Sequence, residues 1–280
     1  MSKIFIPPRQ DKGNKNNPPE SSPFFRKGRT GGFERVSAII CAAGKGNRMA
    51  GATPAKQVKQ FLNLGGRPLL TYSLKTFIDS SIIEQIVLVV PKGMINYTKK
   101  KVVAKLKCGR KKILLIEGGK ERQDSVSQGL KALSDDTKIV VIHDGVRPFV
   151  TREMINEVVK QAIKFRAAVT AIPMTDTVKK AEGKFFIRTV DRSRLWRIQT
   201  PQAFEYSLIR KAYETASALG YYATDDASLV ENLGVRIKIV LGSIQNIKVT
   251  TLEDFRLAEA ILDQISNIKN QKHKSTKTTR

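Results

Sequence analysis

The sequence predicts an α/β protein, with a mostly parallel β-sheet covered by helices on both faces. Short apolar segments alternate along the chain with segments of helical spacing. Several of these segments, such as residues 139–142, are apolar throughout, which is typical of strands buried on both faces of a parallel sheet. Strands that alternate with helices in this way favour a doubly wound sheet over an all-β or all-helical fold.

The elements follow from the same patterns in chain order. Apolar runs predict strands at 36–40, within 82–91, and at 113–116, 139–142, 167–172, 237–241 and 247–249. Helical spacing and capping residues predict helices at 92–106, 121–133, 151–165, 206–219 and 251–265, and one that opens at 224–226.

Three stretches depart from this alternation. Residues 1–34 are rich in Pro, Asn, Gly, Lys and Ser and predict a disordered basic extension. Residues 174–200 predict a projecting β-hairpin, with its turn at Glu182-Gly183. Residues 266–280 predict a disordered basic tail, so that residues 35–265 form the folded domain.

Composition narrows the class of partner. The chain has 50 Lys+Arg against 25 Asp+Glu, a net charge of +25 that suggests an anionic partner. The two terminal segments supply ten of these charges, and we expect the other fifteen to be spread over the body. Basic residues are not interleaved with aromatics and no zinc-finger spacing occurs, so specific nucleic-acid binding is not expected.

The cysteines and the apolar runs indicate the compartment. Cys41 and Cys108 form neither a disulfide framework nor a metal pattern, which fits a reducing cytoplasm. No apolar run approaches the roughly 20 residues of a membrane span, and the N-terminus lacks the apolar core of a secretory signal. We therefore expect a cytoplasmic protein, with a plastid location as the alternative.

The stretch from Ala42 to Met49 is the first candidate site. A buried strand ends here in Ala42-Ala43-Gly44-Lys45-Gly46-Asn47-Arg48, a loop whose glycines allow consecutive N–H groups to surround phosphate oxygens. Arg48, with Lys56 or Lys59, would add positive charge. The loop lacks both the Gly-Lys-Ser/Thr of a P-loop and the third glycine of the dinucleotide fingerprint. An ordinary strand-to-helix turn is the alternative.

Three further loops follow predicted strands, where doubly wound sheets bind ligands. Gly118, Gly119 and Ser125 follow one strand, and close backbone approach beside a hydroxyl suits hydrogen bonds to a base. Asp144 ends another, and its carboxylate suits Mg²⁺ bridging phosphate oxygens. A glycine turn and a turn-forming Asp are the simpler alternatives, and we assign His143 no chemistry.

Eight motifs, in this order, together resemble one family: AAGKGNRM, KQFLNLGGRPLL, GGKERQDSV, HDGVRPFV, DTVKK, VDRSRLWRIQTPQAF, TDDAS and NIKVT. They are similar to those of the 2-C-methyl-D-erythritol 4-phosphate cytidylyltransferases and cover residues 36–265. The resemblance implies a Rossmann-like, nucleotidyltransferase-type fold and the transfer of CMP from CTP to a sugar-alcohol phosphate, with release of pyrophosphate.

The resemblance also implies roles for the matching residues. Arg48 and Lys59 would be catalytic, and Lys56-Gln57 offers a competing register for the lysine. The implied nucleotide-binding residues are Ala42, Ala43, Gly44, Gly46, Gly118, Gly119, Ser125, Asp144 and Gly145, with Asp144 also the Mg²⁺ ligand. The implied substrate-binding residues are Arg147, Thr177, Arg192, Thr200 and Lys248, and the arm at 174–200 would join a homodimer in which Arg192 serves the neighbour's site.

Two other functions remain open from the sequence. A ribitol-5-phosphate cytidylyltransferase shares the framework, because both acceptors present a phosphate and hydroxyls. A basic nucleic-acid-binding protein is favoured only by the charge and the two basic terminal segments. A dinucleotide-dependent oxidoreductase is the weakest reading, since the third glycine is missing.

Overall fold

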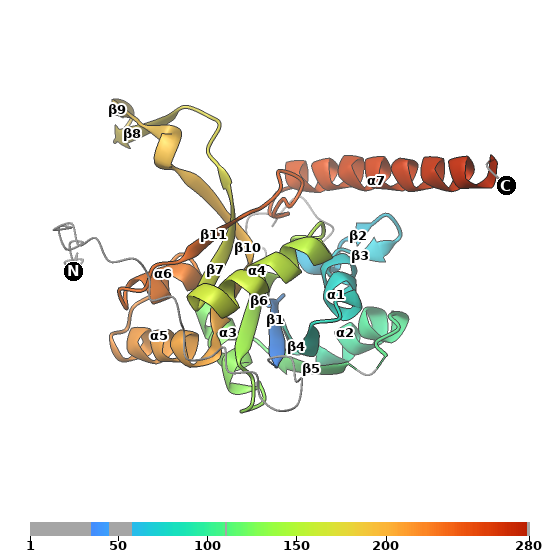
Figure 1. Ribbon diagram of the computed structural model, residues 1–280, viewed down its shortest axis with the longest axis horizontal. Coiled ribbons are helices and arrows are strands. Elements are labelled where there is room, and N and C mark those ends of the chain that lie inside the picture. Colours follow the sequence, from blue (N-terminus) through green and yellow to red (C-terminus); the bar gives the residue numbers. More distant parts are fainter. Residues whose placement is uncertain (1–34, 45–57, 110, 279–280) are drawn as a thin grey trace. The chain divides into compact units, whose positions relative to one another are not determined.

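A seven-stranded sheet, of order β11-β7-β10-β6-β1-β4-β5, forms the centre of the protein (Figure 1). The computed structural model describes residues 35–44, 58–109 and 111–278, with side chains described up to residue 268. The β1–β4, β4–β5, β1–β6 and β7–β11 pairs are parallel. Only β10 is antiparallel to its neighbours, β6 and β7. The predicted mostly parallel α/β sheet is confirmed.

The bounds of the elements show how closely they match the apolar runs. The strands of the sheet are β1 (Val36–Cys41), β4 (Ile83–Val90), β5 (Lys112–Glu117), β6 (Ile139–Asp144), β7 (Ala167–Pro173), β10 (Trp196–Glu205) and β11 (Lys238–Leu241). Two hairpins are formed by β2 (Asn63–Leu64) with β3 (Arg67–Pro68), and by β8 (Val178–Glu182) with β9 (Phe185–Val190). The α-helices are α1 (Leu70–Asp79), α2 (Ile95–Lys101), α3 (Arg122–Lys131), α4 (Arg152–Phe165), α5 (Tyr206–Ala218), α6 (Asp226–Glu231) and α7 (Leu252–Thr278).

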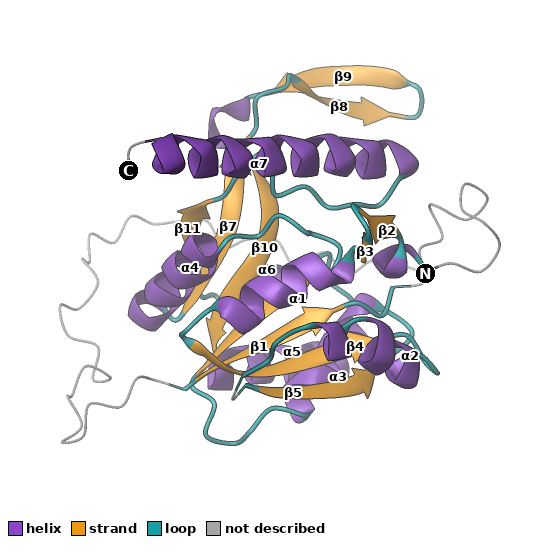
Figure 2. Ribbon diagram, turned by 90° about the vertical axis from the view of Figure 1, so that its right-hand side faces the viewer, coloured by secondary structure: helices purple, strands orange, loops and turns teal. Residues whose placement is uncertain are grey.

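Helices cover both faces of the sheet, and Figure 2 shows them on either side of the strands. Successive strand residues point to opposite faces, so Ala38 and Ile40 of β1 pack in a core with α1 and α4. Ile39 packs in a second core with α3, α5 and α6. Burial on both faces is why these strands are apolar throughout rather than on alternate residues.

A third, smaller core holds the last helix. Ala258 and Ile261 of α7 pack with Leu64, Val146 and Val249. The helix begins at a cap in which the Thr251 side chain accepts from the Asp254 N–H (3.2 Å) and the Asp254 carboxylate accepts from the Thr251 N–H (2.8 Å). This reciprocal cap satisfies two backbone donors that lack partners within the helix, as the sequence predicts.

The antiparallel strand β10 corrects one expectation. We assigned residues up to 200 to the projecting arm and the next helix to 206–219, with no strand of the central sheet between them. Instead, β10 lies between β6 and β7, and its residues from Gln199 to Phe204 are buried. Pro201 and the polar Gln199, Thr200 and Gln202 conceal the strand, because proline is unusual inside a central strand. The hairpin itself, β8–β9, is confirmed.

Three smaller expectations are also wrong. The helix expected at 92–106 is split into α2 and a 3₁₀ turn, η4 (Val103–Lys105), at a pair of β-branched valines. Residues 247–249 form no strand, although the Val249 N–H donates to the Val146 carbonyl (2.9 Å). Helix α7 continues past residue 265 to Thr278, so residues 266–278 are helical rather than disordered, since no Gly or Pro interrupts them.

The topology determines where a ligand can bind. From β1 the chain continues to β4 and then β5 on one side, whereas β6 lies on the other side of β1. The carboxyl ends of β1 and β6 are therefore neighbours at a switch point, with Cys41 paired to Asp144. Crevices of doubly wound sheets form at this position. Within the part of the chain that the structure describes, no helix is both long enough and apolar enough to span a membrane.

Candidate active site at the carboxyl edge of the sheet

A cavity of about 470 Å³ lies where β1, β5 and β6 end, and we call it the β1 cavity. Its walls come from the loop after β1, the 3₁₀ turn η3 (Lys59–Phe61), the N-terminus of α3 and the end of β6. The lining residues are Cys41, Ala42, Ala43, Gly44, Lys59, Gln60, Gly119, Lys120, Glu121, Arg122, Ser125, Asp144, Val146 and Lys248. A helix N-terminus with several cations around it suits an anionic ligand.

Close backbone approach explains the glycine that follows β5. A Cβ on Gly118 would lie 2.2 Å from the Ala43 Cβ and 2.7 Å from the Ser125 Oγ, so only glycine lets these loops meet. The Ser125 hydroxyl accepts from the Gly119 N–H (3.1 Å) and donates to the Glu121 carbonyl (3.1 Å). Ser125 therefore lines the cavity and also fixes the loop that forms its wall.

The Arg122 guanidinium joins two buried carboxylates. Its Nε donates to Asp144 Oδ1 (2.9 Å), and its two terminal nitrogens donate to the two oxygens of Asp226 (2.9 and 2.7 Å). Tyr213 also donates to Asp226, which is fully buried. Arg122 is the first residue of α3, where a reciprocal cap between Glu121 and Asp124 fixes the helix start. Helix start and carboxylates together set the direction of this arginine.

Three cations surround the Asp144 carboxylate. Lys248 Nζ lies 2.9 Å from Oδ2 and Arg147 Nε lies 3.6 Å from it, in addition to Arg122 on Oδ1. Burial alone would raise the pKa of Asp144, but the charges of Arg122, Lys248 and Arg147 outweigh it and hold that pKa well below its usual range. The residue is therefore an anion at neutral pH, within a site that is otherwise positive.

A chain of hydrogen bonds sets the position of Asp144. Burial lowers the pKa of His143 to about 3, so its ring is neutral at pH 7 and has one donor and one acceptor nitrogen. Nε2 faces the Arg147 carbonyl (3.2 Å) and must donate, so Nδ1 accepts from the Thr200 hydroxyl (3.0 Å). The Thr200 oxygen in turn accepts from the Asp144 N–H (3.0 Å). His143 thus has a structural role, which agrees with the sequence analysis, where we assign it no part in the chemistry.

A second cavity, of about 540 Å³, shares a wall with the first, and we call it the β10 cavity. Arg122, Asp144 and Lys248 line both cavities. Arg147 also lines it, and its NH1 donates to the Asn246 carbonyl (2.8 Å) while its buried Nε has no hydrogen-bond partner. Arg122, Arg147 and Lys248 together give this wall positive charge, which suits it to an anion.

The structure brings together most of the predicted residues that it describes. Eight of them line the β1 cavity: Ala42, Ala43, Gly44, Lys59, Gly119, Ser125, Asp144 and Lys248. Gly118 and Gly145 pack directly behind them: a Cβ on Gly145 would lie 3.1 Å from the Ala42 Cβ. Arg147 and Thr200 line the β10 cavity. The Thr200 proton is already donated to His143, so a lone pair is what it offers a ligand.

Other predicted residues are not part of these walls. Thr177 and Arg192, at either side of the arm, are exposed and line neither cavity; Arg192 donates to the Thr175 carbonyl. Gly46, Arg48 and Lys56 lie outside the described residues, so the choice between Lys56 and Lys59 stays a prediction.

Sequence reasoning missed four residues that organise the site. Arg122 and Asp226 lie in the motifs GGKERQDSV and TDDAS, and Asn246 begins NIKVT, but the motifs alone assign them no partner. Gln60 donates to the Ala42 carbonyl and thereby ties the Lys59 turn to the loop after β1. The position of Arg122 in the sequence could have identified it, because it lies just after the glycine loop that follows a predicted strand.

The donor set limits how a magnesium ion can bind. Both Asp144 oxygens face cations, and the described residues contain no group of three His, Cys, Asp or Glu side chains that could hold a metal. Magnesium is commonly held by one or two carboxylates together with substrate phosphates. The site fits an ion held mainly by a ligand's phosphates, with Asp144 as the protein's contribution.

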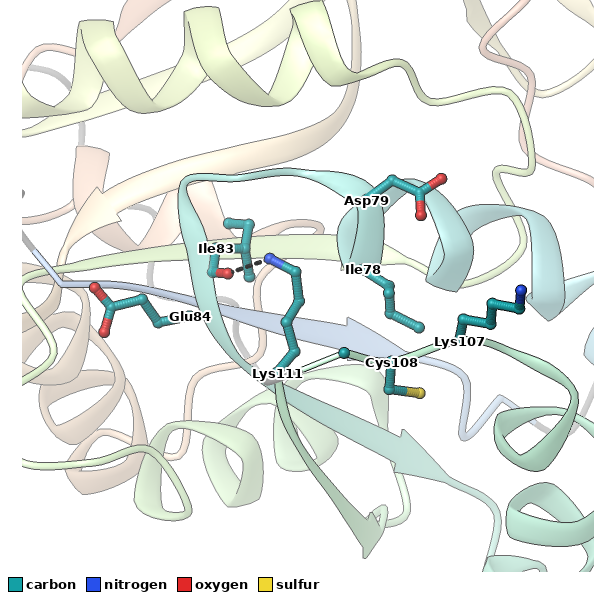
Figure 3. A pocket seen from close by; sticks show the side chains of 8 residues that line it. Ile78, Asp79, Ile83, Glu84, Lys107, Cys108 and Lys111 are labelled. Carbon is teal, nitrogen blue, oxygen red and sulfur yellow. Dashed lines mark hydrogen bonds between the residues drawn. The ribbon is translucent and has the colours of Figure 1, made fainter.

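A third cavity lies away from this chemistry, and we call it the edge cavity (Figure 3). Its lining includes Asp79, at the end of α1, Ile83, at the start of β4, and Lys111, just before β5. These are the amino ends of the strands, opposite the edge where doubly wound sheets bind ligands. We therefore place the candidate active site at the β1 and β10 cavities.

Fold and site together define a nucleotidyltransferase-type α/β protein, with its candidate site at the switch point of a doubly wound sheet. The sequence profile of the 2-C-methyl-D-erythritol 4-phosphate cytidylyltransferase family matches residues 36–264. The chain belongs to this family.

Individual relatives agree. A 2-C-methyl-D-erythritol 4-phosphate cytidylyltransferase of Pelotomaculum thermopropionicum is 46% identical over 231 residues, which are 82% of this chain and 95% of the relative. One of Geobacillus kaustophilus is 47% identical over 226 residues, 80% of this chain and 96% of the relative. The crystal structure of a 4-diphosphocytidyl-2C-methyl-D-erythritol synthase from Anaerococcus prevotii superposes with a TM-score of 0.72 at 35% identity, covering 82% of this chain and 96% of the other.

Proposed function

We propose that this chain transfers CMP from CTP to 2-C-methyl-D-erythritol 4-phosphate, giving 4-diphosphocytidyl-2-C-methyl-D-erythritol and pyrophosphate. The single observation that carries the proposal is the shared wall of Arg122, Asp144 and Lys248 between two cavities. A triphosphate in the β1 cavity and a phosphorylated acceptor in the β10 cavity would meet at this wall. Family membership supports the choice of both substrates.

The reaction needs positioning and charge stabilisation more than covalent chemistry. A phosphate oxygen of the acceptor attacks the α-phosphorus of CTP, and the bond from that phosphorus to the pyrophosphate oxygen breaks. Lys59, in the wall of the β1 cavity, stabilises the charge that develops on the phosphates, and Arg48, in the loop sequence from Ala42 to Met49, has the corresponding role. Lys248 stands at the shared wall, where it can contact both substrates.

The acceptor phosphate is assigned to the β10 cavity. Arg147 and Lys248 place positive charge in its wall, and Thr200 of the same wall can accept from a hydroxyl of the acceptor. Asn246 holds this wall in place, because its amide donates to the Thr200 carbonyl (2.9 Å) while its own carbonyl accepts from Arg147.

Magnesium belongs to the proposal as a cofactor that enters with the nucleotide. Asp144 is the carboxylate that would hold it, and the ion would supply charge neutralisation between the phosphates of CTP. The ion pairs of Asp144 with Arg122 and Lys248 keep the carboxylate ionised and in place before the substrates bind.

A homodimer is proposed through the β8–β9 arm. Phe185 and Phe186 at its tip are 80% and 76% exposed, and Ile187 is also exposed. A partner surface would bury these side chains, and it would bring Arg192 and Thr177 to the neighbour's acceptor site, since they line neither cavity of their own chain. We also propose that the protein is located in the cytoplasm.

Pyrophosphate release tests the function and its acceptor together. The protein is incubated with CTP and Mg²⁺ and offered 2-C-methyl-D-erythritol 4-phosphate and ribitol 5-phosphate in parallel. We expect release with the first acceptor only. Release with ribitol 5-phosphate alone would move the chain to the polyol reaction, and no release with either from folded protein would overturn the proposed transfer.

A further inference from the structure

A strongly basic surface lies outside the active site, on the connection between β4 and β5. Residues 92–112 contain eight lysines, one arginine and no acidic residue, whereas the whole of residues 36–265 carries a net charge of +15. The charge of the body is therefore not spread out, as we expected, but concentrated in this segment. Seven of its lysines are exposed, and we call them the lysine surface: Lys92, Lys99, Lys100, Lys101, Lys105, Lys107 and Lys112.

The acidic side chains beside this segment have other partners. Asp79 and Glu84 line the edge cavity with Lys107, but Asp79 pairs with Lys75 (2.5 Å) and Glu84 with Arg35 (3.0 Å). Glu117 accepts from the Gly93 N–H (2.7 Å). Among the described residues, no carboxylate lies within 4.0 Å of the amino group of any lysine of this surface. Their charge is left for solvent or a partner.

Lys111, in contrast to the lysines of this surface, has a structural role in the fold. Its amino group is turned inward and donates to the Ser80 and Ile83 carbonyls, as Figure 3 shows for Ile83. It thereby fixes the turn between α1 and β4. The lysines of the surface make no such contact with the backbone within the described residues.

Local structure accounts for only part of the surface. Cations in the last turn of α2 interact favourably with its C-terminus, which suits Lys99 to Lys101. A lysine on an edge strand prevents pairing with another chain, which suits Lys112 on β5. Lys92, Lys105 and Lys107 lie in neither position, so stability of the fold leaves them unexplained.

The rest of the segment indicates which polyanion would bind. Its apolar side chains, including Met94, Ile95, Val103 and Leu106, pack against the core, so this segment presents few apolar groups for insertion into a lipid surface. The described cations of this segment are all lysines, which bind phosphate as point charges rather than through a fixed fork. Compact ammonium groups along one segment match the repeating phosphates of a nucleic acid.

We propose that the lysine surface binds the phosphate backbone of a nucleic acid without sequence preference. Tyr97 lies in the same segment and packs edge-on against Phe61 at 5.1 Å, so we assign it no base stacking. The proposal is independent of the CMP transfer and leaves the expectation against specific nucleic-acid binding unchanged.

The test compares two full-length variants with equal charge loss. In one, Lys99, Lys100, Lys101 and Lys105 are changed to Gln; in the control, the exposed Lys131, Lys138, Lys164 and Lys211 of other elements are changed to Gln. Fluorescence anisotropy measures binding to a labelled single-stranded RNA of mixed sequence between 50 and 300 mM NaCl. Both variants keep the basic terminal segments, so these contribute equally.

Each lost phosphate contact lowers the slope of log K against log salt by about 0.7 for a single strand, so the surface variant should lose about 3 units of slope. Its affinity should fall roughly tenfold or more at 100 mM NaCl, and the control should change by much less. Equal losses in both variants, or no binding by the wild type at 50 mM NaCl, would overturn the proposal. So would binding to phosphatidylglycerol vesicles that depends on these four lysines when RNA binding does not. Thermal unfolding verifies that both variants are folded.

Discussion

Two buried aspartates share one arginine, yet their surroundings give them different roles. Asp226 is fully enclosed, lines neither cavity, and has both oxygens bound by Arg122 and Tyr213. Asp144 lies in the wall of both cavities, where Arg122, Lys248 and Arg147 surround it. The comparison indicates that Asp226 holds Arg122 in place, whereas Asp144 faces the two cavities.

Removing Asp226 should have the largest effect on stability. In Asp226→Ala the Arg122 guanidinium loses two of its three hydrogen bonds to carboxylates, and the Tyr213 hydroxyl loses its acceptor in the interior. Breaking such a buried pair costs about 3–5 kcal/mol of the free energy of unfolding, measured by urea titration. The exposed Asp135→Ala serves as control, and an equally small loss in both would show that Asp226 does not anchor the arginine.

A change from arginine to lysine should have the next largest effect. Lysine keeps the charge at position 122 but lacks the fork that contacts Asp144 and Asp226 together. We expect Arg122→Lys to lower the free energy of unfolding by about 1–3 kcal/mol.

The matched control is Arg210→Lys, which alters an exposed pair with Glu214 at 3.1 Å and should change stability little, as surface pairs generally do. Equal stability of the two variants in the same denaturant series would argue against a structural role for the fork of Arg122.

The smallest effect tests the phenol that completes the Asp226 site. Tyr213→Phe removes a single donor to a buried carboxylate and should cost about 1–2 kcal/mol of the free energy of unfolding. Tyr222→Phe removes a similar bond to Asp124 at 2.9 Å on the surface and should leave stability close to that of the wild type. A larger loss at Tyr222 than at Tyr213, in the same urea titrations, would reverse the assignment of the buried site.

The same contrast explains how far the sequence could predict the fold. Apolar runs locate β1, β4, β6 and β7 because both faces of these strands are buried, and they also locate β5, an edge strand that is only partly buried. They fail for β10, since a strand that carries Gln199, Thr200 and Gln202 toward the site has no apolar pattern. They also do not predict that α7 continues past residue 265, because nothing in the pattern of apolar residues requires the extra turns.

Prediction of the site has a similar limit. Glycine loops and Asp144 can be recognised because their residue types suit phosphate and metal chemistry. Arg122 and Asp226 lie 104 positions apart, and their pairing exists only after α3 and α6 pack on the same face of the sheet. Thr200 is the converse case. It is predicted to bind substrate, and its hydroxyl also positions Asp144 by accepting from the Asp144 N–H.

The most direct test of the account is the effect of Asp144→Ala on CMP transfer. Pyrophosphate release from CTP, Mg²⁺ and 2-C-methyl-D-erythritol 4-phosphate is measured for the wild type and the variant, with thermal unfolding to verify the fold. The account predicts release by the wild type and a rate at least about 100-fold lower in the variant, because the cations that stabilise the phosphate charge lose the carboxylate that positions them. A folded variant with an undiminished rate would contradict the assignment of the active site to this edge of the sheet.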